Sequence, residues 1–346
     1  MQIWAVLLDS YRLLMDRKLF LITLGISILV VLIYASIGFD DNGIFVLFGA
    51  YYLECEQLQA GSPWAEGLYL WIFSFVIVGL WLTWAATILA LISTTPIFID
   101  FMSDGAIDLV LSKPINRIRL FFFKYLGGLL FVLLQVGLFA VGVFLCIGWR
   151  LGQWNWSIFS AIPLVVVFFS YLYSVNVLLS ILTRSALASL LLTLLFWLVL
   201  FCVQFAEGQL TKAKVEEEMA AGLPSRSADA ENHSVRSSRN PLSQKAEEFT
   251  VWRDRVRMVL IPFPKTQETL GLLDRWITID SSHSMDQLLI QGMVNSMDNN
   301  SYLSEMAKRM EAEYGNRSPL YIIGSSLGFE FVVLSFACFL FVRKDF

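Results

Sequence analysis

The chain has 346 residues, of which 57% are hydrophobic and only 16% are charged. Average soluble proteins carry about 45–50% apolar and about 25% charged residues, so this composition excludes a soluble enzyme with a large water-facing surface. The net charge is −4 and the basic residues form no stripe, which gives nucleic-acid binding no support. The four cysteines form no Cys-x-x-Cys pair and the two histidines lie in one polar segment. Neither a zinc site nor a disulfide framework is therefore predicted.

Residues 1–18 precede the first apolar run and have an amphipathic pattern. Apolar side chains recur at helical spacing on one face, and charged side chains lie opposite. The apolar ones are Trp4, Leu7, Leu8, Tyr11, Leu14 and Met15, and the charged ones are Asp9, Arg12 and Asp16. This pattern predicts an amphipathic helix lying in the membrane interface. A cytoplasmic extension of the first span is the alternative, and the pattern leaves it open.

Six windows with almost no charged residues follow along the chain. They are residues 19–39, 67–99, 125–149, 151–183, 185–206 and 318–342, the last interrupted only by Glu330. About 20 apolar residues cross the hydrocarbon core as an α-helix. The two longest windows are too short for two spans and a loop, but each can hold one long helix plus an interfacial piece. We therefore predict an all-α polytopic membrane protein with six transmembrane helices, five in residues 19–206 and the sixth, with a short tail, in residues 319–346.

The connections between these windows differ in their Lys and Arg content. The N-terminal, second, fourth and C-terminal connections hold ten such residues, whereas the first and third hold one, Arg150. The ten are Arg12, Arg17, Lys18, Lys113, Arg117, Arg119, Lys124, Arg184, Arg343 and Lys344. Because short cytoplasmic connections are enriched in Lys and Arg, we predict that both termini are cytoplasmic.

A polar insertion, residues 207–318, separates the fifth and sixth windows and holds 31 of the chain's 54 charged residues. The predicted orientation places it outside. Residues 211–248 are rich in Glu, Ser, Arg and Ala, which predicts disorder or a loose helix, with disorder favoured. Residues 249–315 regain apolar side chains at helical spacing and predict a small extracytoplasmic helical cap; a tether of no specific function is the alternative. An apolar patch in it, suited to an interface or a packed lid, consists of Met258, Val259, Leu260, Ile261 and Phe263.

Two signatures of covalent chemistry are missing from the sequence. No glycine precedes a lysine, so the phosphate-binding loop of nucleotide hydrolases is absent, and there is no His-Glu-x-x-His run. We predict that this chain has no catalytic residues and binds no cofactor or metal. It is expected not to be an enzyme.

The second connection, residues 100–124, is the most informative segment. It is short, mixed in charge and partly apolar, and its apolar stretch ends in a Ser-Lys-Pro break at residues 112–114. A proline ends a helix in this way, so the segment suits docking into a groove on a soluble partner. An ordinary loop that follows the charge rule is the alternative.

This connection resembles the cytoplasmic loop of type-2, exporter-class ABC transporter permeases. The resemblance rests on an acidic-Gly pair, an apolar stretch, the run Leu-Ser-x-Pro-Ile-x-Arg and a later lysine, together with the six-span plan, the amphipathic N-terminus and the basic tail. It implies that a separate cytoplasmic ATPase, which would bind ATP and Mg²⁺, drives the membrane helices through this loop. The matching residues are Asp104, Gly105, Leu111, Ser112, Pro114, Arg117 and Lys124.

The same resemblance implies a dimer with a second permease copy or a paralogue, in the lipid of a bacterial cytoplasmic (inner) membrane. Two features depart from the family pattern. Asp104 stands where glutamate is usual, and the 112-residue insertion replaces a short outer loop. The insertion leaves the substrate open.

Glu330 is the one charged residue inside a predicted span, at the thirteenth of 25 positions in its window. An ionised, unpaired carboxylate near the membrane centre costs about 2.5–3.5 kcal/mol on insertion scales. We therefore expect Glu330 to face the bundle or a polar cavity. Two roles remain open, a place on the translocation path or a structural hydrogen bond between helices. The candidate partners are Ser326, Gln135, Asn176 and Gln204, and Gly324 with Gly328 forms a small-residue face for helix contact.

The sequence therefore favours a membrane permease subunit that exports an unidentified substrate using ATP hydrolysed by a partner chain. The alternative is a non-transporting membrane protein whose extracytoplasmic cap binds a partner and whose helices only anchor it.

Overall fold

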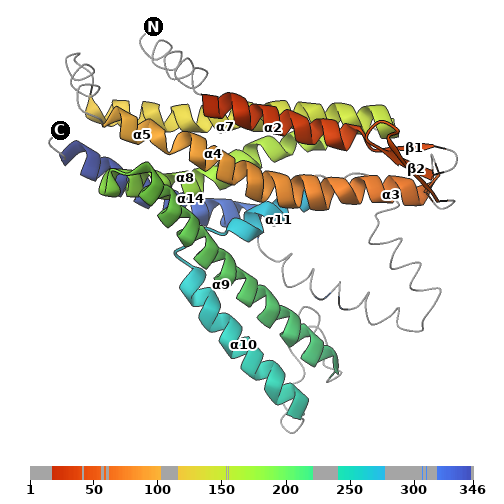
Figure 1. The fold of residues 1–346 in the computed structure, drawn as a ribbon. Coiled ribbons are helices and arrows are strands. Elements are labelled where there is room, and N and C mark those ends of the chain that lie inside the picture. The colour runs from red at the N-terminus through yellow and green to blue at the C-terminus, as the bar shows by residue number, and fades with distance from the viewer. Residues whose placement is uncertain are drawn as a thin grey trace. The chain divides into compact units, whose positions relative to one another are not determined.

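The computed structural model is built from helices and one small sheet (Figure 1). It describes residues 18–40, 43–55, 58–59, 62–102, 116–152, 154, 156–220, 241–276, 306, 309 and 318–343. Among them, five helical stretches are long and apolar enough to cross a membrane: Gly79–Phe101, Arg117–Arg150, Trp156–Thr183, Ala186–Met219 and Pro319–Arg343. A shorter apolar helix, Leu21–Ala35, lies in the first predicted window. The prediction of an all-α polytopic membrane protein is confirmed, while the interfacial helix predicted at 1–18 lies outside the described residues except for Lys18.

A three-stranded antiparallel sheet follows helix α2 (Lys18–Ala35), and the sequence analysis did not predict it. Its strands pair in chain order and are β1 (Gly38–Asp40), β2 (Gly43–Val46) and β3 (Tyr51–Glu54). A Cβ on Gly43 would lie 2.2 Å from the backbone oxygen of Leu53, and the φ of Gly43 is 153°. Glycine is therefore required where β2 meets β3. Strands of three or four residues are too short to produce a recognisable alternation in the sequence.

The second predicted span, 67–99, is one continuous helical run. Helix α3 (Pro63–Trp71) begins at Ser62, whose hydroxyl oxygen accepts a hydrogen bond from the Ala65 amide at 3.1 Å, and Pro63 occupies the first turn. A stretch of wide π turns, η2 (Ile72–Ala86), follows, and the chain then returns to α-helix in α4 (Thr87–Thr94) and α5 (Pro96–Phe101). This window therefore holds a single span, as the sequence predicts.

The third and fourth predicted spans are separated by a glycine turn. Helix α7 (Arg117–Leu151) starts at Asn116, whose side chain accepts from the Ile118 amide at 2.9 Å, and stops at Gly152, whose φ is 69°. A single 3₁₀ segment, η3 (Trp156–Ser160), leads into α8 (Ala161–Thr183). The window 151–183 thus divides into a short piece and one long helix.

The insertion is more helical than its composition suggests. Helix α9 (Ala186–Ala220) runs 14 residues past the end of its apolar window, and α10 (Pro241–Leu260) and α11 (Thr266–Trp276) follow before α14 (Pro319–Arg343). Residues 211–220 and 241–248 are therefore helix, so of the two predicted alternatives, disorder and a loose helix, these parts follow the second. In residues 211–220 buried side chains explain the helix, since Thr211, Lys214 and Val215 are almost fully covered. Most of the predicted cap beyond residue 276 lies outside the described part of the chain.

The chain forms two compact units. The first holds residues 1–195, 269–288 and 330–346, and the second holds residues 196–268 and 289–329. In the first unit, α7 packs against α8 and α2. The aromatic side chains at the centre of this unit are buried. Gly142 of α7 lies so close to Val31 of α2 that a Cβ would come within 2.9 Å of the valine Cγ1. This small residue allows the close approach of the two helices.

Candidate functional site

The predicted coupling loop is described at its two ends. Asp104, Gly105, Leu111, Ser112 and Pro114 lie outside the described residues. Arg117 and Lys124, by contrast, lie on the first turns of α7. The Arg117 guanidinium donates from Nη1 to the backbone oxygen of Val342 at 3.3 Å, and the Lys124 ammonium lies 5.4 Å from the centre of the Phe101 ring. The ends of α5, α7 and α14 therefore meet where the loop leaves the bundle.

Four phenylalanines form the base of this loop. The Phe98 and Phe121 rings lie 5.4 Å apart, Phe121 and Phe341 lie 5.8 Å apart, and Phe101 and Phe341 lie 6.0 Å apart. All four side chains are buried. They come from α5, α7 and α14, so the loop is anchored on a packed aromatic cluster. The sequence does not reveal this cluster, because each phenylalanine lies in an apolar stretch that gives no sign of which residues it contacts.

Glu330 lies at the junction of three helices in the first unit. Its Oε1 accepts a hydrogen bond from the Tyr125 hydroxyl of α7 at 2.7 Å, and its Oε2 accepts from the Ser170 hydroxyl of α8 at 2.6 Å. The Tyr125 oxygen is also 3.1 Å from the Ser170 carbonyl oxygen. Glu330 is only 8% exposed. Both oxygens of this carboxyl group therefore have a hydroxyl partner, and the prediction that it faces the bundle is correct.

A stack of aromatic rings holds the Tyr125 hydroxyl in place. The Tyr125 and Tyr173 rings lie 5.1 Å apart and almost parallel, and Phe169 stacks on Tyr173 at 5.4 Å. A Cβ on Gly128 would come within 2.4 Å of the Tyr173 oxygen. Gly128 therefore makes room for Tyr173, and Tyr173 in turn supports the ring that hydrogen-bonds to Glu330.

The partners predicted for Glu330 are wrong, because each of them bonds elsewhere. Gln135 donates to the Ser27 hydroxyl at 3.5 Å, and Asn176 donates to the Thr193 hydroxyl at 3.2 Å. Gln204 donates to the Pro264 carbonyl oxygen at 2.9 Å. Ser326, one turn before Glu330 on α14, donates to the Ile322 carbonyl oxygen at 2.8 Å. The true partners are the hydroxyl groups of Tyr125 and Ser170. Tyrosine and serine are common in apolar windows, so the sequence does not single these two out.

Ser326 also lies in the run Gly324-Ser325-Ser326-Leu327-Gly328, which has the Gly-x-Ser-x-Gly spacing of a nucleophile elbow. That motif requires a sharp turn from a strand into a helix. Here the run lies inside helix α14, so it does not build a nucleophile. Among the described residues no group of His, Cys, Asp and Glu side chains is placed to hold a metal ion.

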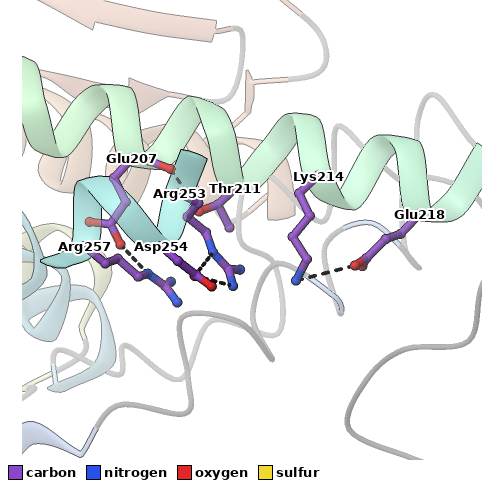
Figure 2. A network of polar contacts seen from close by, with 7 residues as sticks. All are labelled: Glu207, Thr211, Lys214, Glu218, Arg253, Asp254 and Arg257. Carbon is purple, nitrogen blue, oxygen red and sulfur yellow. Dashed lines mark hydrogen bonds and ion pairs between the residues drawn. The ribbon is translucent and has the colours of Figure 1, made fainter. Parts of the chain in front are cut away.

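A second polar cluster lies in the second unit, between α9 and α10 (Figure 2). Arg257 donates from Nε to the Glu207 carboxylate at 2.6 Å. Arg253 contacts Asp254 at 3.2 Å, and Lys214 lies 3.5 Å from Glu218 one turn further along α9. Glu207 is the first charged residue after the apolar window of α9. One of these ion pairs, between Glu207 and Arg257, joins the two helices just beyond the end of that window.

Comparison with known protein families explains the overall plan of the chain. Residues 4–346 match the family described as ABC-2 family transporter protein. The chain belongs to that family. No curated protein and no solved structure matches it.

As an ABC-2 family protein, the chain is an integral membrane permease component of an ABC transporter. Membership implies association with an ABC ATPase partner, and permeases of this family are transport subunits that are generally not themselves catalytic. The family match covers the insertion and the helices alike, so the polar segment is part of the matched chain.

Proposed function

We propose that this ABC-2 permease exports a substrate across a bacterial cytoplasmic membrane, driven by ATP hydrolysis on a separate subunit. The family match over residues 4–346 is the observation that carries the proposal. The charge asymmetry of the connections supports an orientation with both termini in the cytoplasm and the 207–318 insertion outside. A second permease copy or a paralogue completes the pathway, and ATP and Mg²⁺ bind to the partner ATPase.

In this proposal residues 100–124 receive the force from the ATPase. The contacts at the base of the loop support this role, because α5, α7 and α14 meet there in the buried phenylalanine cluster. Tyr125 directly follows Lys124 and hydrogen-bonds to Glu330. A displacement of the loop would therefore be passed through α7 to the three-helix junction. This is a mechanical path through packed side chains, and its coupling has to be measured.

The first experiment asks whether an ABC ATPase co-purifies with the chain and whether the complex hydrolyses ATP. If an ATPase is present, three changes in the loop are tested: Gly105→Trp, Pro114→Ala and Arg117→Ala. We expect transport-linked ATP hydrolysis to fall while the protein still inserts, because a few positions carry most of the energy of such contacts. Arg119→Ala is the matched control, since Arg119 is an exposed cation on the same turn of α7. Normal ATP hydrolysis and transport with all three changes would remove the loop from the coupling mechanism.

The second experiment tests the orientation. Single cysteines at Ser112 and between residues 220 and 240 should react with membrane-impermeant reagents from opposite sides of the membrane. Reaction of both from one side would overturn the six-span arrangement and the outward position of the insertion. If no ATPase associates with a correctly inserted chain, the alternative of a membrane-anchored binding protein gains support.

A further inference from the structure

The last turn of α10 and the connection to α11 form an uncharged segment, residues 258–264, with the sequence Met-Val-Leu-Ile-Pro-Phe-Pro. Seven charged residues lie in the preceding part of α10, between residues 245 and 257. Three apolar side chains of the segment are well exposed: Met258 is 68%, Val259 is 60% and Ile261 is 61% exposed. Neighbouring exposed apolar side chains of this kind mark a surface that another phase or partner covers.

Two hydrogen bonds show how deep this segment lies relative to the apolar helices of its own unit. Gln204 of α9 donates to the Pro264 carbonyl oxygen at 2.9 Å, and the Lys265 amide donates to the Ser326 hydroxyl of α14 at 2.9 Å. Gln204 precedes Glu207, the first charged residue after its window, by three residues, and Ser326 follows Ser318, the start of its window, by eight. At 1.5 Å per residue, the connection therefore lies about 4.5 Å inside the apolar part of α9 and about 12 Å inside that of α14.

We infer that residues 258–263 dip into the bilayer and that Met258, Val259 and Ile261 contact lipid chains. The segment lies at the same depth as parts of the apolar runs of α9 and α14. These two helices are long enough to cross the membrane. A lipid-facing position removes these exposed apolar side chains from water, which is favourable. The insertion is thus a membrane-dipping hairpin over this stretch.

The polar groups next to the segment fit this placement. Lys265 follows the two prolines, but its ammonium group donates to the Ser325 hydroxyl at 2.8 Å and lies 4.6 Å from the centre of the Tyr321 ring, so it is directed at protein. On the other side, Arg255 stacks on the exposed Trp252 at 5.2 Å. Trp and Arg together are typical of the headgroup region. The order along α10 is therefore charged, then aromatic and basic, then apolar.

Nitroxide labels in reconstituted vesicles test the inference. Cysteines are placed one at a time at Ile261, Val259 and Glu248 in a chain whose four native cysteines are replaced by alanine. Glu248 is the matched control, because it is exposed on the same helix in its charged part. We expect collisions with oxygen, which concentrates in lipid, to exceed collisions with a water-soluble nickel complex severalfold at 261 and 259, and the reverse at 248.

Two results would overturn the inference. Nickel collisions at 259 and 261 as frequent as at 248 would place the segment in water. Low collision rates with both probes, together with spin–spin broadening, would show that a second copy of the chain covers the patch. The measurement needs neither an ATPase nor transport, so its failure is distinguishable from failure of the proposed function.

Discussion

Glu330 and Glu207 are equally buried, each at 8% exposure, yet they are stabilised differently. Glu330, in the middle of an apolar helix, bonds to the hydroxyls of Tyr125 and Ser170. Glu207, the first charged residue after an apolar run, pairs with the guanidinium of Arg257 at 2.6 Å. A second charge deep in the membrane would add its own insertion cost, whereas at the end of the run both ions can keep part of their hydration. Burial alone therefore does not determine the partner of a carboxyl group.

The largest loss of stability is expected from breaking the ion pair between Glu207 and Arg257. Arg257→Leu removes the guanidinium that pairs with the buried Glu207 carboxylate at 2.6 Å, and hydrogen bonds to charged groups contribute about 1.5–3 kcal/mol. We expect a clear fall in the thermal unfolding temperature of the purified protein. Arg255→Leu is the control on the same helix, because Arg255 stacks on an exposed ring, and it should change stability little. If both changes lower the unfolding temperature equally, the loss comes from removing any arginine of α10 and not from breaking the pair with Glu207.

A smaller loss of stability is expected from crowding the ring stack of Tyr125, Tyr173 and Phe169. Gly128→Ala pushes against Tyr173, which is held between the rings of Tyr125 and Phe169. Overpacking costs about 1–3 kcal/mol. Gly137→Ala lies on the same helix with nothing within 4 Å of the new Cβ, so it should not lower the unfolding temperature. A neutral Gly128→Ala would mean that the stack moves freely and does not position Tyr125.

The smallest effect separates the two roles of Glu330. Glu330→Gln keeps the shape and hydrogen-bonding ability of the side chain, whereas Glu330→Leu removes the partner of both hydroxyls. Because hydrogen bonds between membrane helices contribute about 0.6 kcal/mol on average, a structural Glu330 predicts that Gln is tolerated and Leu loosens packing by about 1 kcal/mol. We expect this structural outcome. Transport by the assembled complex is measured alongside stability, and a loss of transport in Glu330→Gln alone would place Glu330 on the translocation path.

The sequence predicted the helices well because uncharged windows report directly on membrane crossing. It also singled out Glu330, since one charge in an apolar window is conspicuous. It did not find Tyr125 as the partner of Glu330, because hydroxyl side chains are common in apolar windows. It also started this span at residue 125, directly after Lys124, whereas α7 begins at Arg117. Helix termini depend on caps such as Asn116, which a count of charges does not detect.

The sheet and the regular helix at residues 211–220 escaped prediction for related reasons. Strands β1 to β3 are held by pairing between short segments, and their local sequences carry too few residues to show a period. Residues 211–220 have a polar composition, but Lys214 and Val215 are buried against neighbouring structure. Tertiary contact overrode the composition in that stretch.

The hydrogen bond from Arg117 to the carbonyl oxygen of Val342 also helps to fix the position of α14 along its own axis. Glu330 lies twelve residues before Val342, which is about 18 Å along the helix axis. A cation that caps the last carbonyl groups of α14 is favoured by the helix dipole, so this end resists sliding. If α14 slipped by one turn, about 5.4 Å, the Glu330 carboxyl would lose the Tyr125 and Ser170 hydroxyls together. The register of α14 along the membrane normal is therefore fixed at both points, and any movement of the helix must release the two at once.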